Sequence, residues 1–298
     1  MEQEYINSLT PETREILSKS DEERINYVKT EKFIMYPRAK EILNKMEELM
    51  MEPKRSRMPC LLIVGDSNSG KTSLWKKLLR MYPPTDGMEE AALPVVALGA
   101  PSTPDVSALL DRIMRAMELP FKKSDSITAK ENLIHYHFRN LEVKMLVIDE
   151  IHNLLSGSVA RQKVFMNEVK NLSIEMEIPI VLVGIKEALH ATDTDLQISS
   201  RFRPILLPRW KLDRDYVSFL VDIESTLPFK KPSGIARDRK MAESILDLSD
   251  GLLGEIVHII TVSALHAIKT GREKITMDII KECEFDKPSQ RRGTKMVE

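Results

Sequence analysis

Short apolar runs alternate with helix-like segments through the middle of the chain. The runs that predict strands occupy residues 61–64, 94–98, 145–148, 180–183 and 205–207. Between them, apolar residues recur at helical spacing over residues 105–118, 128–140 and 159–176. Strands that alternate with helices predict a doubly wound parallel sheet, and continuous apolar strands suit a sheet covered on both faces. The pattern therefore predicts an α/β fold.

The segments on either side of this region carry helical patterns only. Two short helices are predicted at 8–18 and 21–28, and Pro37 is expected to begin an amphipathic helix. After Pro208, helical segments follow at 213–226, 238–248, 254–269 and 276–283. The expected domains are an N-terminal helical extension (1–34), an α/β domain (35–210), a helical lid domain (211–285) and a basic flexible tail (286–298).

A phosphate-binding loop follows the first apolar run. Residues 65–72 read Gly-Asp-Ser-Asn-Ser-Gly-Lys-Thr, which fits the pattern G-x-x-x-x-G-K-[ST] between a strand and a helix. Glycines let backbone N–H groups surround a phosphate at the positive end of the following helix. We expect Lys71 to reach the β- and γ-phosphates of a nucleotide, and the Thr72 hydroxyl to bind Mg²⁺. The expected nucleotide-binding residues are Gly65, Asp66, Ser67, Asn68, Ser69, Gly70, Lys71, Thr72 and Ser73.

The third apolar run delivers two acids, Asp149 and Glu150, at its carboxyl end. Beside a phosphate loop, Asp149 would hold Mg²⁺ and Glu150 would polarise the water that attacks the γ-phosphate. The alternative is a helix N-cap with an acidic first turn. GTPases usually carry Asn-Lys-x-Asp after the fourth strand, whereas residues 184–187 read Gly-Ile-Lys-Glu. ATP hydrolysis is therefore the expected reaction.

This order of motifs resembles the AAA+ ATPases over about residues 35–285. The resemblance implies a five-stranded sheet of order 5-1-4-3-2, followed by a small helical lid. It also implies that an arginine just before the fifth strand completes the site of a neighbouring subunit. Arg201 is our candidate for this arginine finger and Arg203 the second, and the alternative is a surface pair of arginines that binds local acids.

Two positions depart from the AAA+ pattern. The first sensor, usually asparagine or threonine at the end of the fourth strand, is replaced by Gly184 and Ile185. Glu255 stands near the place of the basic second sensor in the lid. Both departures suggest slow, partner-stimulated hydrolysis, with ATP acting mainly as an assembly switch.

The finer resemblance is to the TniB/TnsC family of transposition ATPases, in which Cys60 and Ile185 look like local substitutions. The stretches that carry it are 24–29, 36–39, 57–66, 148–155, 182–188, 201–204 and 207–210. The resemblance implies that ATP-loaded subunits assemble into a ring or helical filament on double-stranded DNA without reading its sequence. The homo-oligomer would mark a target and recruit a transposase, with a target-selection protein as a further partner. Hydrolysis would disassemble it.

The same resemblance suggests which residues contact DNA and adenine. The loops after the second strand and the next helix, 99–107 and 121–128, would face the duplex. Expected DNA contacts are Ser102, Thr103, Ser107, Lys122, Lys123 and Ser124, and the alternative is that these are ordinary solvated loops. Tyr36 and Pro37 are candidate walls of the adenine pocket, with a packing role as the alternative.

Composition sets outer limits on these interpretations. The chain has 298 residues, 42% of them hydrophobic, and a net charge of −1, so no general basic field indicates nucleic acid. Cys60 and Cys283 lack motif spacing and suit buried thiols in a reducing, bacterial cytoplasm. An acidic N-terminus and the lack of an apolar run near 18 residues predict no signal peptide or membrane span. The basic residues 54–57 are interpreted as a solvated linker.

Two other functions share this fold. A replication initiator or helicase loader would normally carry a helix-turn-helix domain after the lid, whereas this sequence ends about a dozen residues beyond the expected lid. A nucleotide switch that binds only protein partners would normally be fused to repeats or an effector. The transposition regulator is therefore preferred.

Overall fold

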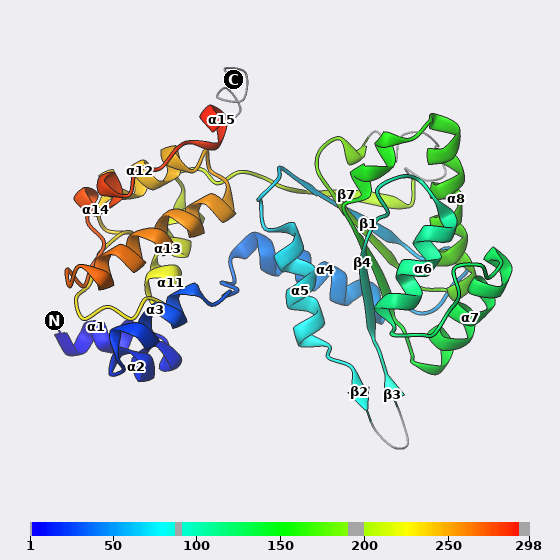
Figure 1. Cartoon of the computed structure of the whole chain (residues 1–298), viewed down its shortest axis with the longest axis horizontal. Helices are drawn as coiled ribbons and strands as arrows, with labels where there is room; N and C mark the ends of the chain where they lie inside the picture. The colour runs from blue at the N-terminus through cyan, green and yellow to red at the C-terminus, as the bar shows by residue number, and fades with distance from the viewer. Residues whose placement is uncertain (1, 87–90, 190–199, 292–298) are drawn as a thin grey trace. The chain divides into compact units, whose positions relative to one another are not determined.

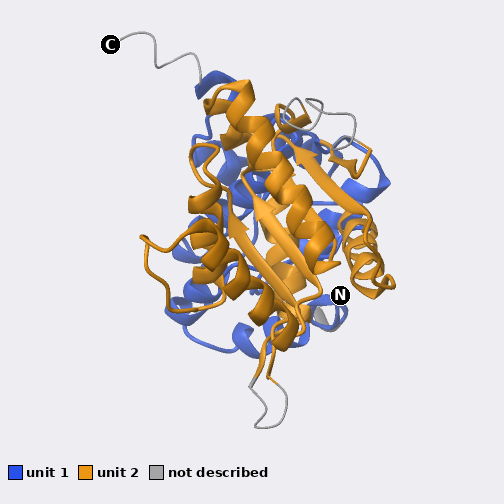
Figure 2. Cartoon of the chain, turned by 90° about the vertical axis from the view of Figure 1, so that its right-hand side faces the viewer, with its two compact units in different colours: residues 1–37, 209–298 blue, residues 38–208 orange. Residues whose placement is uncertain are grey.

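The computed structural model describes residues 2–86, 91–189 and 200–291. They form two compact units (Figure 2). Unit 1 combines Met1–Pro37 with Arg209–Glu298, and unit 2 is Arg38–Pro208. The N-terminal helices therefore share a unit with the C-terminal helices, although the α/β unit separates them in sequence.

Unit 2 contains a parallel sheet of five strands in the order β4-β5-β6-β1-β7. Read from its other edge, this is the expected order 5-1-4-3-2, and the predicted α/β fold of the AAA+ type is confirmed. The strands of the sheet are β1 (Cys60–Gly65), β4 (Val95–Gly99), β5 (Met145–Asp149), β6 (Ile180–Gly184) and β7 (Phe202–Leu207).

Helices cover both faces of this sheet (Figure 1). Alternate strand residues such as Leu62, Leu146 and Leu182 form one apolar core with Leu109 and Phe165 from the helices. On the other side, α5 contacts β1, β4 and β6. Apart from Pro37, which belongs to unit 1, the helical segments of this unit are α4 (Pro37–Met51), α5 (Lys71–Met81), α6 (Val106–Ala116), α7 (Ile127–Asn140), the short 3₁₀ helix η1 (Ile151–Ser156) and α8 (Val159–Met176).

The last strand differs from its sequence prediction. β7 begins at Phe202, before Pro204, so Arg203 lies within the strand instead of preceding it. Proline removes one ladder hydrogen bond, which an edge strand tolerates, and β7 pairs only with β1 in this sheet. A short hairpin, β2 (Thr85–Asp86) with β3 (Ala91–Ala92), was not predicted because each strand has only two residues.

Unit 1 is helical in its described part. Its helices are α1 (Glu2–Ser8), α2 (Pro11–Leu17), α3 (Asp21–Lys29), α11 (Arg214–Glu224), α12 (Arg239–Leu248), α13 (Leu253–Lys269), α14 (Met277–Glu282) and α15 (Pro288–Arg291). Ser20 and Glu23 form a reciprocal capping box that begins α3. No single helix of the described residues is long and apolar enough to cross a membrane; α12 and α13 pass that test only as a pair bent by 119°.

Two long-range contacts tie the ends of the chain together within unit 1. The Arg24 guanidinium is fully buried and lies 2.7 Å from the Glu273 carboxylate, which joins α3 to the segment after α13. The Tyr5 hydroxyl donates a hydrogen bond to the carbonyl of Phe229. Near the C-terminus, Lys287 pairs with Asp247, so the beginning of the predicted basic tail contacts this unit.

Candidate nucleotide-binding site

The predicted phosphate loop lies between β1 and α5, at the carboxyl edge of the sheet. Gly70, directly before α5, has a φ of 90°, and Asn68 has a φ of 63°. These left-handed conformations turn the loop back toward the helix N-terminus. At Gly65 a Cβ atom would lie 2.7 Å from Ser69 Oγ and 2.8 Å from the Leu207 carbonyl, so a side chain does not fit there. The loop is therefore a tight cradle suited to a phosphate.

Lys71 is folded against this loop. Its side-chain nitrogen donates to the carbonyl oxygens of Gly65 at 2.9 Å and Asp66 at 2.7 Å. Burial lowers the pKa of Lys71, while the charges of Asp149, Glu150 and Asp66 act in the opposite sense. A bound phosphate would offer the ammonium group a full negative charge in place of carbonyl dipoles. The ammonium therefore sits where the loop can present it to an anion.

Asp149 receives hydrogen bonds from both neighbouring segments. Its Oδ2 atom accepts from the Thr72 hydroxyl and from the Trp75 indole N–H, each at 2.8 Å. Its Oδ1 atom accepts from the backbone N–H of Glu150 at 2.8 Å. The hydroxyl and carboxylate predicted to hold Mg²⁺ are thus brought together, and both are the hard oxygen ligands that this ion prefers.

The donor set fits a magnesium ion shared with a nucleotide. Among the residues that the structure describes, no group of three or more His, Cys, Asp or Glu side chains could hold a metal by itself. Mg²⁺ usually takes one or two protein ligands and completes its shell with phosphate oxygens and water. Thr72 and Asp149 match that small protein share.

Glu150 follows Asp149 at the end of β5 and projects into solvent. Its backbone is left-handed, with a φ of 58°, and its side chain is 54% exposed. The Glu150 Oε2 atom lies 3.1 Å from Nε2 of His152, in the first turn of η1. The candidate base thus directly follows Asp149 and is accessible to water, with His152 as its neighbour.

The first-sensor position has no room for a polar side chain. A Cβ atom on Gly184 would lie 2.8 Å from the Ala188 Cβ atom and 3.0 Å from Ile151 Cγ2. Asparagine or threonine there would need the backbone to shift. Two residues later, Lys186 lies 3.3 Å from Asp66 of the loop, a cation that the sequence pattern did not single out.

The two candidate finger arginines lie at the other edge of the sheet. Phe202 pairs with Cys60 at the start of β1, whereas Leu207 pairs with Gly65 at its end. β1 has six residues, so its ends are about 17 Å apart at the usual rise of a strand. Arg201, directly before β7, is therefore remote from the phosphate loop of its own chain.

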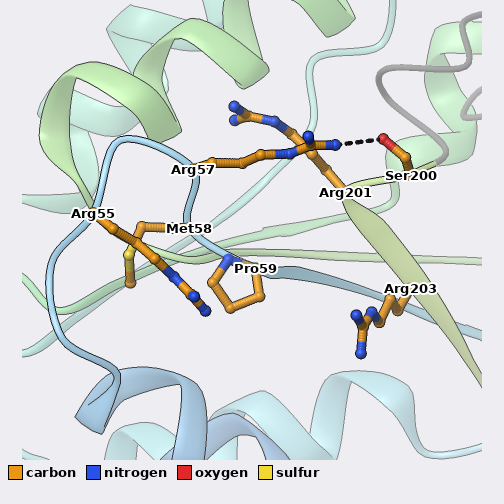
Figure 3. Close-up of a pocket in the computed structure, with 7 residues that line it drawn as sticks. All are labelled: Arg55, Arg57, Met58, Pro59, Ser200, Arg201 and Arg203. Carbon is orange, nitrogen blue, oxygen red and sulfur yellow. Dashed lines mark hydrogen bonds between the residues drawn. The ribbon is translucent and has the colours of Figure 1, made fainter.

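The basic linker, residues 54–57, is exposed as predicted, and two of its arginines lie beside Arg201 and Arg203. Arg55 and Arg57 line the same pocket as Arg201 and Arg203, together with Met58, Pro59 and Ser200 (Figure 3). Arg57 donates a hydrogen bond to the Ser200 hydroxyl at 2.9 Å. No sequence pattern links residues 54–57 to the segment before the fifth strand; only the pairing of β1 with β7 does so.

The two predicted DNA loops differ in how their side chains are used. Ser102, Thr103, Lys122, Lys123 and Ser124 are exposed. Ser107 instead lies in the first turn of α6, where its hydroxyl accepts a hydrogen bond from the buried Lys130. The remaining predicted residues, Tyr36 and Pro37, belong to unit 1; Tyr36 is buried and its ring lies 5.0 Å from that of Trp210.

The residue near the second-sensor position of the lid, Glu255, forms an ion pair. Glu255, at the start of α13, forms an ion pair with Arg291 of α15 at 2.9 Å, and both residues belong to unit 1. An acid therefore stands where the AAA+ resemblance led us to look for a base.

The sheet order and the strand–loop–helix site define a class of protein, the AAA+ P-loop ATPases. Similar solved structures include Cdc6p from Pyrobaculum aerophilum, at 17% identity and a TM-score of 0.61, covering 86% of this chain and 69% of that one. The ORC2 protein of Aeropyrum pernix gives 16% identity, a TM-score of 0.61, and coverage of 86% and 71%. Drosophila ORC bound to DNA has 14% identity and a TM-score of 0.55, and the match covers 89% of this chain and 65% of that one. At these identities the likeness shows the fold alone.

The family is narrower than the class. The profile of the family described as Bacterial TniB protein matches residues 24–212, more than half of the chain. The chain belongs to the TniB family of transposition-associated AAA+ ATPases, which confirms the family suggested by the sequence motifs. No curated protein sequence matches it.

Proposed function

We propose that this chain is an ATP-dependent regulator of DNA transposition. ATP-bound subunits assemble on double-stranded DNA, mark it as a target, and recruit or activate a transposase. Hydrolysis of ATP then releases the assembly. One observation carries the proposal. In this chain of the TniB family, the phosphate loop lies at the carboxyl ends of β1 and β7, and the two arginines lie at their amino ends.

The chain's own groups account for nucleotide binding. Lys71 leaves the loop carbonyls and contacts the terminal phosphates, while backbone N–H groups at the start of α5 surround them. Thr72 and Asp149 hold Mg²⁺, which offsets phosphate charge when it is bound. Lys186 adds a cation beside the same loop.

Glu150 acts as the base in hydrolysis. Its exposed carboxylate orients a water molecule and takes up its proton as the water attacks the γ-phosphate. The lack of a polar side chain at Gly184 removes one group that would otherwise position that water. We therefore propose a slow intrinsic rate that rises when a partner protein or DNA orders the site.

Arg201 completes the site of another subunit. A separation of about 17 Å along β1 prevents it from reaching its own loop, since an arginine side chain spans roughly half that length. An arginine that stabilises charge on the transferring phosphoryl group can raise the rate by about 10³-fold or more. The requirement for two subunits makes hydrolysis dependent on assembly.

Contacts with DNA come from the exposed loops that precede α6 and α7. The lysines Lys122 and Lys123, with the hydroxyls of Ser102, Thr103 and Ser124, bind phosphates without reading bases. Two lysines give a single subunit weak affinity, and a polymer sums many such contacts. Assembly and DNA binding therefore stabilise each other.

Electron microscopy of the full chain with random duplex DNA tests this function. With a non-hydrolysable ATP analogue at low salt, we expect rings or filaments on the DNA. Lys71→Ala should abolish assembly because the loop loses its phosphate contact. Glu150→Gln should assemble with ATP but turn it over at least about 100-fold more slowly, as expected for removal of a general base.

Two results would contradict the proposal. One is the absence of any nucleotide-dependent assembly by the wild-type chain. The other is normal ATP turnover by Glu150→Gln, which would reject the assignment of the base. An exposed control, Glu175→Gln on α8, should behave as wild type in both measurements.

A further inference from the structure

Four arginines line one pocket at the amino edge of the sheet. Arg55 and Arg57 precede β1, Arg201 directly precedes β7, and Arg203 is the second residue of β7 (Figure 3). The pocket encloses about 250 Å³, and its other lining residues are Met58, Pro59 and Ser200. Among the described residues, no carboxylate lines the pocket. Because guanidinium groups stay protonated in proteins, the pocket carries concentrated positive charge.

The side chains of this arginine pocket are partly organised and partly unsatisfied. Arg57 donates to the Ser200 hydroxyl, which joins the linker to the residue directly before Arg201. The Nη1 atom of Arg201 is buried and has no hydrogen-bond partner among the described residues. Arg55 pairs with Glu52 at 3.1 Å, but this pair is half exposed and contributes little. A buried donor without an acceptor calls for an explanation, and an anion that enters this pocket would supply the acceptor.

We infer that the arginine pocket binds the terminal phosphates of ATP held by a second copy of this chain, and that Arg55 and Arg57 belong to the site. The inference rests on the proposed function and extends it from one finger to a pocket built by two segments. Arg201 and Arg203 contact the phosphates, Arg57 contacts them and positions Arg201 through Ser200, and Arg55 adds charge at the opening.

The arrangement of charge favours a nucleotide over a DNA backbone. Phosphates of a duplex form an extended track, which proteins follow with basic groups spread along a surface. Here the positive groups instead surround one small concave space. Arginine binds clustered phosphate oxygens in a bidentate manner, and a triphosphate places several charges within that space.

The position of the pocket favours a second copy of the chain. The phosphate loop and the arginine pocket lie at opposite ends of the same paired strands, β1 and β7. A head-to-tail contact between copies places one end against the other, and repetition of that contact gives a ring or a helical filament. The anionic nucleotide on one copy then faces the cationic pocket of the next.

The first test measures phosphate binding without assembly. The full-length Lys71→Ala chain is titrated with inorganic tripolyphosphate by isothermal calorimetry, because its own loop is then impaired. We expect saturable binding that weakens about tenfold when Arg57→Gln is added, as for loss of one charge-assisted contact. The control Arg139→Gln, an exposed arginine of α7, should leave binding unchanged.

The second test asks whether the pocket serves another subunit. Lys71→Ala keeps the pocket but lacks a working loop, and Arg57→Gln keeps the loop but lacks a complete pocket. Each alone should show little DNA-stimulated ATP turnover. The ATP turnover of a mixture of the two variants should exceed the sum of their separate turnovers, because the intact pocket of one variant then meets the intact loop of the other. Arg57→Lys, which keeps the charge without the fork, should give intermediate turnover.

Three outcomes overturn the inference. They are equal tripolyphosphate affinity with and without Arg57→Gln, wild-type turnover by Arg57→Gln, and a mixture no more active than the sum of its parts. Loss of nucleotide-free DNA binding in Arg57→Gln, with turnover intact, would instead assign the pocket to DNA. If the wild-type chain itself fails to assemble on DNA, the proposed function fails, whereas the tripolyphosphate result still decides whether the pocket binds phosphate.

Discussion

Asp149 is the residue at which three parts of the nucleotide site meet. The hydroxyl of Thr72, the indole of Trp75 and the backbone N–H of Glu150 all donate to its carboxylate. These bonds hold both carboxylate oxygens of Asp149 in place. The bond from the Trp75 indole restricts the Asp149 side chain to one orientation. Trp75 is therefore a positioning residue for the proposed metal ligand.

Replacing Trp75 by phenylalanine removes one of these donors while keeping an aromatic ring. We expect the Mg²⁺ concentration that half-saturates ATP turnover to rise about tenfold, as for loss of a hydrogen bond that orients a metal ligand. Titration of ATPase activity with Mg²⁺ measures the change. Tyr136→Phe, which alters an exposed ring on α7, is the control. An unchanged Mg²⁺ requirement would show that Trp75 only packs.

The buried pair of Arg24 and Glu273 holds the two ends of unit 1 together. Burial raises the pKa of Glu273, but hydrogen bonds from Arg24 and from the backbone N–H of Lys230, with the charges of both residues, outweigh it and lower the pKa. The pair therefore stabilises the fold above the ordinary carboxyl range. That contribution is lost as the pH falls through the lowered value.

Arg24→Met should destabilise the protein by about 3–5 kcal/mol at neutral pH, because it leaves Glu273 buried and unpaired. Without Arg24, the pKa of Glu273 should rise. Protonation of Glu273 at low pH should then stabilise the variant, whereas it destabilises the wild type. The difference in unfolding free energy between the wild type and Arg24→Met should become smaller as the pH falls from 7 to about 4.5. Urea unfolding across that range measures it. Arg239→Met, an exposed ion pair of α12, is the matched control.

A constant gap across this pH range would mean that Arg24 stabilises the protein through packing alone. A double variant, Arg24→Met with Glu273→Leu, should recover much of the lost stability, because no charge is then left buried.

At the scale of elements, the segment after Glu150 connects the nucleotide site to a proposed DNA loop. The 3₁₀ helix η1 begins at Ile151, and its Ser156 hydroxyl donates to the carbonyl of Ser102 at 2.8 Å. The backbone N–H of Ala100 donates to the carbonyl of Asp149 at 2.6 Å. A change at the acids of β5 can therefore reach the loop that follows β4 through direct contacts.

The buried Lys130 contacts both proposed DNA loops. It is 1% exposed, and its nitrogen contacts Asp111 at 2.7 Å, the Ser107 hydroxyl at 2.8 Å and the Lys123 carbonyl at 3.4 Å. Three segments, the start of α6, the loop before α7 and α7 itself, thus share one cation. The backbone of the loop that carries the exposed Lys122 and Lys123 is thus tied to this buried lysine through the carbonyl of Lys123.

Lys130→Met keeps the side-chain length but removes these contacts. We expect a loss of about 3 kcal/mol in unfolding free energy, faster hydrogen exchange over residues 121–126, and weaker DNA assembly. Exchange measured by mass spectrometry localises the effect. Lys130→Met combined with Asp111→Leu should restore stability without restoring the loop, and equal exchange in all three proteins would reject this role for Lys130.

Single elements were predictable where local pattern and burial agree. Strands β1, β4, β5 and β6 and helices α6 to α8 were foreseen because each carries a continuous apolar run or a helical apolar stripe. β7 was foreseen only in part, since a proline hides the beginning of a strand whose edge position is a tertiary fact. The two-residue hairpin β2–β3 is too short to leave a periodic signal.

For the whole molecule, the proposed assembly should make DNA binding steeply dependent on salt. Each subunit offers Lys122 and Lys123, so the slope of log affinity against log salt should grow by about 1.8 per subunit engaged. Fluorescence anisotropy of labelled duplex with a non-hydrolysable ATP analogue measures the slope. Lys122→Gln with Lys123→Gln should flatten it strongly, whereas Lys40→Gln with Lys144→Gln, two exposed lysines elsewhere in unit 2, should change it little. A slope unaffected by the first pair would place the DNA contact on another surface.

The sequence by itself determined the class of fold and the location of the candidate nucleotide site. A phosphate loop, an acid pair at a strand end and alternating apolar runs depend on neighbours within a few residues, so they are legible along the chain. Tertiary structure alone decided three other features: the edge position of β7, the buried Arg24–Glu273 pair, and the meeting of residues 55–57 with Arg201 and Arg203. The reason is that strand pairing and burial bring together residues more than a hundred positions apart, and no local pattern records that proximity.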